Sequence, residues 1–189
     1  MKKTFILIIL FNSCVSFGWT EYRITISPAD QTEPSISSQT VVWTDARHTT
    51  NNMDIYGANI SDINIPVELQ VAISSGNEYR PSISGNIIAY EANNDVYYHN
   101  ITTGISTKLT NTQTASAAKT DGYTIVWRSG LSSTQRTIEA YDLVTDSFYR
   151  IKGVGNNNWP DVDGRFVVWL VDNTKLCGFD LGTLTKPKD

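Results

Sequence analysis

The chain contains four copies of one short sequence pattern, and this repeat limits its possible folds more than any other feature. Each copy ends a run of apolar residues with an aromatic side chain, as in Val41-Val42-Trp43. The four aromatic residues lie 47, 37 and 42 residues apart and are Trp43, Tyr90, Trp127 and Trp169. Repeats of about 40 residues are typical of β-propellers, in which each repeat forms a blade of four antiparallel strands.

Two further positions recur at fixed distances before the aromatic residue. A proline stands nine residues before it in three copies, and a glycine or serine stands five residues before it in all four. These positions are Pro34, Pro81, Ala118 and Pro160, followed by Ser38, Gly85, Gly122 and Gly164. Proline is tolerated where a strand begins, and glycine permits a tight hairpin turn. The apolar run is typical of a strand buried on both faces, so each copy predicts a strand, a turn and a buried strand.

Each copy continues with further strand-like segments. Third strands are expected at 55–60, 96–101, 138–143 and 176–181, and fourth strands at 67–73, 107–109 and 148–151. The fourth copy lacks a convincing fourth strand, but residues 21–26 share Tyr-Arg-Ile with residues 149–151 at nearly the same distance before a proline. We therefore predict an all-β fold: a small four-bladed propeller of four-stranded antiparallel sheets, in which residues 21–26 close the last blade. The expected blades are 27–73, 74–110, 111–152, and 153–181 with 21–26.

The first eighteen residues predict export. Lys2 and Lys3 precede a short apolar run, 5–11, which is too short to span a bilayer, and small residues follow before Trp19. Residues 1–18 are therefore interpreted as a signal peptide, and residues 19–189 as a protein of the periplasm, the cell surface or the extracellular space. A second interpretation makes Cys14 a lipid-anchor site, because residues 11–14 resemble a bacterial lipoprotein box. After cleavage Cys177 is the one remaining cysteine, which excludes an intramolecular disulfide.

Charge and motif content exclude several classes of function. The formal net charge is −4 and becomes −6 without Lys2 and Lys3, so the surface does not attract nucleic acid or anionic lipid. Beyond the signal segment no membrane span is expected. The sequence contains no Gly-x-Ser-x-Gly elbow, His-Glu-x-x-His motif, P-loop or dinucleotide fingerprint. The two histidines, His48 and His99, lack nearby ligand partners, so we predict neither a metal site nor a cofactor.

Polar side chains near the aromatic positions are the candidate binding residues. Asp45, Arg47 and His48 lie in the longest loop after an aromatic residue, either as part of a ligand-binding patch or as an Asp–Arg pair that fixes the loop. Glu91 and Arg128 directly follow the aromatic residue in the second and third copies. Asp45 and Glu91 are also candidates for the paired acids of a glycoside hydrolase.

Asn158 and Trp159 form a second candidate. They end a run of three asparagines and a tryptophan, residues 156–159, that resembles a sugar-binding cluster. In such clusters amides bind hydroxyl groups and the indole stacks on the sugar ring. The alternative is an ordinary polar loop between blades.

The repeated Pro-x-Ile-x-Gly-x-x-Val-Val-Trp pattern resembles the TolB-like, or WD40-like, β-propeller repeats of bacterial periplasmic and surface proteins. The resemblance covers nearly all of the chain after residue 18 and implies the fold. It does not imply one activity, because this fold carries binding proteins, lyases, glycosidases and peptidase domains. The third copy departs from the pattern at Ala118, and TolB-type propellers usually have six blades rather than four.

These observations favour a non-catalytic binding module that recognises a protein or a glycan on its loop face. One alternative is a polysaccharide lyase or glycosidase that uses acids on that face. Another is half of a larger propeller, completed by a second chain or a further segment. The chain is accordingly expected to be a monomer or a homodimer.

Overall fold

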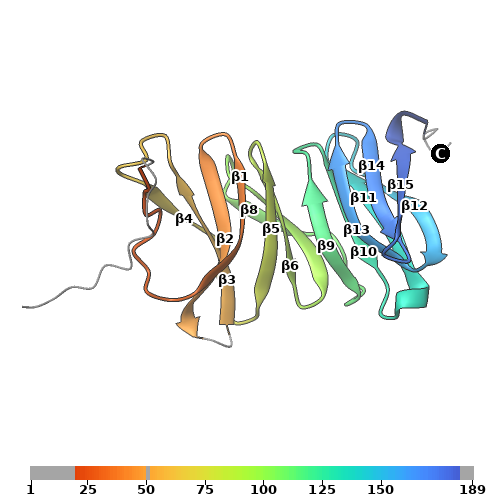
Figure 1. Cartoon of the computed structure of the whole chain (residues 1–189), viewed down its shortest axis with the longest axis horizontal. Coiled ribbons are helices and arrows are strands. Elements are labelled where there is room, and N and C mark those ends of the chain that lie inside the picture. Colours follow the sequence, from red (N-terminus) through yellow and green to blue (C-terminus); the bar gives the residue numbers. More distant parts are fainter. Residues whose placement is uncertain (1–19, 50–51, 184–189) are drawn as a thin grey trace, which may run out of the picture.

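The computed structural model describes residues 20–49 and 52–183. Over these residues the chain folds into four antiparallel sheets that follow one another in sequence (Figure 1). Sheet 1 contains β1 (Gln31–Ser37), β2 (Thr40–Thr49), β3 (Asn52–Asn59) and β4 (Val67–Ala72). Sheet 2 contains β5 (Glu78–Ser84), β6 (Ile87–Ala92), β7 (Asp95–Asn100) and β8 (Ile105–Lys108).

Sheet 3 repeats this arrangement, and sheet 4 repeats its first three strands. Sheet 3 contains β9 (Ala115–Thr120), β10 (Thr124–Ser129), β11 (Arg136–Asp142) and β12 (Ser147–Gly155). Sheet 4 contains β13 (Asn157–Asp163), β14 (Phe166–Val171) and β15 (Lys175–Asp180). Two short 3-10 segments, Ser133–Gln135 and Leu181–Thr183, lie outside the sheets. The predictions of an all-β chain and of blade-like antiparallel sheets are confirmed.

The recurring glycine or serine closes the first hairpin of every sheet. All four residues at this position have a positive φ, between 50° at Ser38 and 93° at Gly122. This backbone conformation favours glycine and is the one that tight hairpins require. The sequence pattern thus determines where the first strand of each sheet turns back into the second, apolar strand.

Consecutive sheets are held together by packed aliphatic side chains. We call the surface that a sheet turns toward the next sheet its forward face, and the surface toward the preceding sheet its backward face. Val42 and Ile55 on the forward face of sheet 1 pack against Ile83 and Ile88 on the backward face of sheet 2. Three of these four positions meet again between sheets 2 and 3, and all four meet between sheets 3 and 4. The buried core is therefore divided among the junctions between neighbouring sheets.

The prediction that residues 21–26 close the last blade is wrong. Residues 20–30 contain no strand, and sheet 4 has three strands among the described residues rather than the expected four. Ile24 instead packs on the outer side of sheet 1, against Trp43, Tyr56 and Ala58. The physical reason is distance, since this segment and β15 lie at opposite ends of the row of sheets (Figure 1).

Within residues 20–49 and 52–183, no strand pairing and no side-chain hydrogen bond joins sheet 1 to sheet 4, so closure of a four-bladed ring stays a prediction. The expected signal peptide and Cys14 lie outside the described residues. Over the part of the chain that is described, no helix has the length and apolar character needed to cross a membrane.

A buried carboxylate secures the passage from sheet 2 to sheet 3. Asp95 Oδ1 accepts hydrogen bonds from the Thr110 hydroxyl at 2.8 Å and from the backbone N–H groups of Thr112 and Gln113 at 2.9 and 3.0 Å. Lys108 Nζ lies 3.0 Å from its other oxygen. Burial opposes ionisation, but Lys108 and the N–H donors outweigh it and hold the pKa of Asp95 below its ordinary value.

We predict that Asp95→Asn lowers the free energy of unfolding by about 2 kcal/mol at pH 7, because a charged acceptor of several hydrogen bonds is lost. A lowered folded-state pKa means that the contribution of Asp95 is present above its unfolded-state pKa and is lost as the pH falls through the folded-state value. The difference between variant and unchanged protein should therefore shrink from pH 7 to pH 3 in urea unfolding.

Asp172→Asn, at an exposed turn of sheet 4, is the matched control and should change stability by less than about 0.5 kcal/mol. An equal loss for Asp95→Asn at both pH values would contradict the role assigned to the ionised carboxylate.

Candidate functional site

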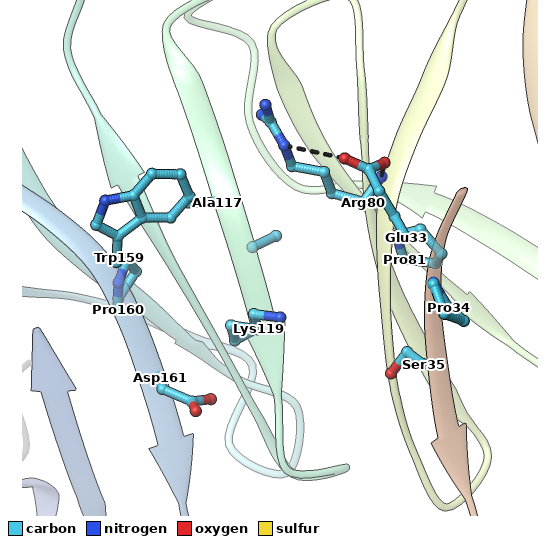
Figure 2. Close-up of a pocket in the computed structure, with 11 residues that line it drawn as sticks. Glu33, Pro34, Ser35, Arg80, Pro81, Ala117, Lys119, Trp159, Pro160 and Asp161 are labelled. Atoms are coloured by element: carbon cyan, nitrogen blue, oxygen red, sulfur yellow. Dashed lines mark hydrogen bonds and ion pairs between the residues drawn. The ribbon is translucent and has the colours of Figure 1, made fainter. Parts of the chain in front are cut away.

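The four inner strands line one shared hollow of about 610 Å³. The inner strand is the first strand of each sheet, namely β1, β5, β9 or β13. Each inner strand contributes the proline or alanine of its repeat, which stands nine residues before the repeat aromatic, together with neighbouring residues. The lining residues are Glu33, Pro34, Ser35, Arg80, Pro81, Ala117, Ala118, Lys119, Trp159, Pro160 and Asp161. Figure 2 shows Trp159 and Asp161 on one side of the hollow, Glu33 and Pro34 on the other, and Lys119 between them.

A bulge at the same repeat position lies at the hollow in all four sheets. The residue before the repeat proline or alanine has a positive φ in every copy: 55° at Glu33, 52° at Arg80, 57° at Ala117 and 50° at Trp159. The register with the neighbouring strand shifts at each of these places. Bulges of this kind bend a strand and redirect a side chain. The repeat therefore delivers one glutamate, one arginine, one alanine and one tryptophan to the same hollow.

Arg80 connects two acids beside the hollow. Its backbone N–H donates to Glu33 Oε2 at 2.9 Å, and its Nε lies 3.5 Å from Glu33 Oε1 (Figure 2). Its Nη1 donates to Glu91 Oε2 at 3.1 Å. Glu91 is buried, and its second oxygen accepts the Ala117 backbone N–H at 2.6 Å. Burial raises the pKa of Glu91, while the positive charge of Arg80 opposes that rise. Glu91 therefore ties sheet 2 to sheet 3 and orients Arg80.

Arg128 and Asn158 form a second polar network behind Trp159. Arg128 Nη1 and Arg136 Nη1 each donate to Asn158 Oδ1 at 2.7 Å. Asn158 Nδ2 donates to Asn173 Oδ1 at 2.9 Å. Burial and the nearby positive charge of Arg136 lower the pKa of Arg128. Asn158 is itself buried, so its amide is used to fix the strand that presents Trp159.

The predicted trio Asp45, Arg47 and His48 lies apart from the hollow. Asp45 is fully buried and accepts hydrogen bonds from Trp43 Nε1 at 2.8 Å, the Arg47 backbone N–H at 2.9 Å and the Arg47 guanidinium at 2.8 and 3.0 Å. Burial opposes the charge of Asp45, but these donors prevail and hold its pKa below the ordinary value. Both carboxylate oxygens of Asp45 are therefore occupied by partners within sheet 1.

The rest of this cluster also bonds within sheet 1. Arg47 donates to Glu68 at 2.6 and 2.9 Å and lies over the Tyr56 ring, 3.7 Å from its centroid. His48 Nδ1 lies 2.7 Å from the buried Asp54. These contacts fit the interpretation of an Asp–Arg pair that fixes the loop.

The structure thus separates the seven candidate residues into two groups. Glu91, Arg128, Asn158 and Trp159 lie at or behind the hollow, whereas the other three lie on sheet 1 beside the N-terminal segment. Sequence reasoning missed the charged residues that line the hollow itself, namely Glu33, Arg80, Lys119 and Asp161. Their shared place beside the repeat proline was the available signal. In the described ranges, no group of three His, Cys, Asp or Glu side chains is arranged to hold a metal ion.

We predict that Asp45→Ala lowers the free energy of unfolding by about 3 kcal/mol, because it leaves the Arg47 guanidinium and the Trp43 indole N–H without their buried acceptor. Lys119→Ala removes an exposed charge from the wall of the hollow and should cost less than about 0.5 kcal/mol. Urea unfolding of both variants measures the difference. Equal stability of the two variants would show that the Asp45 network is not structural.

Comparison with solved structures shows the fold. The chain is similar to TolB from Acinetobacter baumannii, with a TM-score of 0.60 and 18% identity over 82% of this chain and 42% of that one. It is similar to the computationally designed Ika4 protein, with a TM-score of 0.59 and 16% identity over 82% of this chain and 93% of that one.

A third similar structure is the β-propeller domain of the Trilobed protease from Pyrococcus furiosus, described as having an open velcro topology. Its TM-score is 0.56, with 14% identity over 80% of this chain and 50% of that one. No family model and no curated protein matches the sequence. The chain thus spans less than half of the TolB structure, and the resemblance to TolB-like β-propellers is confirmed for the fold.

Proposed function

We propose that the chain is a non-catalytic binding module and that its hollow binds a polypeptide segment of a protein partner. The observation that carries the proposal is the exposed indole of Trp159, 58% accessible, on the wall of a hollow lined by prolines and alanines. Tryptophan dominates many protein interfaces because it buries a large apolar surface at a small entropic cost.

The charges around the hollow favour a polypeptide over a sugar. The lining includes Glu33 and Asp161 as well as Arg80 and Lys119, so both signs of charge are offered to the side chains of a partner. A sugar site would need free amides next to the indole. The amide of Asn158 is instead occupied by Arg128, Arg136 and Asn173.

The acids named as a hydrolytic pair also support binding rather than catalysis. Asp45 and Glu91 are both buried, and each carboxylate oxygen has a hydrogen-bond partner within the protein. A general acid must instead reach the bond that it protonates. Residues 1–18 support export as part of the same proposal, to the periplasm, the cell surface or the extracellular space.

We expect linear peptides selected from a display library to bind in the hollow, and Trp159→Ala to weaken their binding at least tenfold, which corresponds to about 1.4 kcal/mol. Fluorescence titration measures this directly. Among the described tryptophans Trp159 is the exposed one, since Trp43, Trp127 and Trp169 are buried, so a bound peptide should protect it from acrylamide quenching.

Tyr123→Ala is the control, because Tyr123 is also an exposed aromatic residue but lies at the turn between β9 and β10, outside the hollow. It should leave affinity unchanged. Binding to a glycan array without any peptide binding would overturn the proposal in favour of a sugar-recognition module. Release of reducing sugar from a polysaccharide would overturn the non-catalytic assignment.

A further inference from the structure

Sheet 4 exposes the same side chains that the other sheets bury in their junctions. Val168 and Leu176 occupy the forward-face positions of Val42 and Ile55. Their counterparts on sheets 1, 2 and 3 are fully buried, whereas Val168 is 40% exposed and Leu176 is 73% exposed. The neighbouring Phe166 is also exposed. Sheet 4 therefore ends the row with an apolar face of the type that elsewhere receives another sheet.

Sheet 1 exposes the complementary face at the other end of the row. Ile36 holds the backward-face position that Ile83, Thr120 and Val162 hold in the other sheets. Those three residues are buried within their junctions, whereas Ile36 is 61% exposed. Its neighbour Val41 is half-buried, although its counterparts are fully buried. The exposed forward face of sheet 4 and the exposed backward face of sheet 1 are thus the two kinds of face that meet at each internal junction.

The N-terminal segment already lies where an outer strand of a preceding sheet would lie. Ile24 stands ten residues before Pro34, as Val71 of β4 stands ten residues before Pro81. Val71 packs on the backward side of sheet 2, and Ile24 packs in the same way on sheet 1, against Trp43 and Tyr56. Sheet 4 is the sheet that lacks an outer strand among the described residues.

We propose that two copies of the chain join head to tail in a closed ring, in which the forward face of sheet 4 in each copy packs on the backward face of sheet 1 in the other. Residues 21–26 of one copy then pair with the open edge of β15 in the other copy and supply its outer strand. Contacts between unlike faces close into a ring when the rotation between copies allows it. Over 80% of its length the chain matches half of the P. furiosus β-propeller domain, which fits two copies per ring.

The repeat fixes the register of the new strand pair. In sheets 1, 2 and 3 one aliphatic residue that packs between sheets lies in or directly after the outer, fourth strand, and the residue before it always lies opposite the same position of the third strand. These pairs are Gln70 and Tyr56, Lys108 and Tyr97, and Arg150 and Glu139. The corresponding residues at the ends of the chain are Arg23 and Cys177. Arg23 of one copy should therefore lie opposite Cys177 of the other.

Inner-strand acceptors also recur at the proposed junction. Ser35 Oγ accepts the Ile83 backbone N–H at 3.2 Å, and Ser37 Oγ accepts that of Gly85 at 3.0 Å. On sheet 4 the same positions hold Asp161 and Asp163, whose carboxylates also accept hydrogen bonds. They would face the N–H groups of Ile36 and Ser38 in the second copy.

A cysteine cross-link tests the register. Arg23→Cys is introduced into the full chain carrying Cys14→Ser, which leaves Cys177 as the other thiol, and oxidised glutathione is added. Directly opposed residues of antiparallel strands have Cβ atoms about 4.5–5.5 Å apart, close to disulfide geometry. We expect a covalent species of twice the 21.0 kDa chain mass on a non-reducing gel.

An intramolecular link would show closure within one copy, and a ladder of higher species would show an open chain. Either result would overturn the proposal.

Light scattering of the chain with Leu176→Lys and Val168→Lys tests the junction without a cross-link. Without these changes we expect a mass twice that of the chain, and with them the mass of one chain. Val144→Lys, at an exposed turn of sheet 3, is the control and should leave the doubled mass unchanged. A single-chain mass for the unchanged protein would overturn the proposal. Because Trp159 does not lie at this junction, peptide binding and dimer formation can fail independently.

Discussion

The packing of one aliphatic pair on another between consecutive sheets is the interaction on which the whole structure depends. One sheet of a repeat protein cannot bury its apolar face alone, and stacking of neighbouring sheets buries it. Val42 and Ile55 become fully buried because sheet 2 covers them, and the same happens at the next two junctions. Burying one such side chain contributes about 1.5–3 kcal/mol. The sheets are therefore stable as a row, and the most important contacts lie between sheets.

This arrangement places the inner strands side by side and gives the hollow its composition. The repeat must keep its aliphatic positions, but the bulged residue before the proline or alanine belongs to none of the apolar clusters between sheets. Glu33, Arg80, Ala117 and Trp159 differ completely in chemistry while sharing one backbone conformation. A rigid repeat with one unconstrained position per copy is a scaffold for a binding surface. The networks of Glu91 and Asn158 then hold Arg80 and Trp159 in place from behind.

Much of the fold could be predicted from the sequence, because the features that specify it are local. The Val-Val-Trp strands and the positive-φ turns at Ser38 and Gly122 follow directly from residue type and spacing. The candidate site was less accessible. The partners of Asp45 are close in sequence, but its complete burial depends on how sheet 1 folds around it. The bulges at Glu33 and Arg80 change which way a side chain points, and a two-residue periodicity cannot show this. Residues 21–26 have the sequence of an outer strand, but whether they pair depends on a sheet edge being within reach.

Residues 21–26 pair with no described strand because the first and last sheets of a repeat array differ from the internal ones. Each internal sheet has its forward face covered by the next sheet and its backward face covered by the previous one, so local sequence alone ensures that its apolar positions are buried. Among the described residues, sheets 1 and 4 carry the same apolar pattern but have no neighbouring sheet on one side. Ile24 covers Trp43 and Tyr56 at one end, yet Ile36 stays exposed beside them, and Val168 and Leu176 stay exposed at the other. The same aliphatic positions thus stabilise the fold where a neighbouring sheet covers them, and at the two ends of the row they form an exposed apolar face that another sheet can cover.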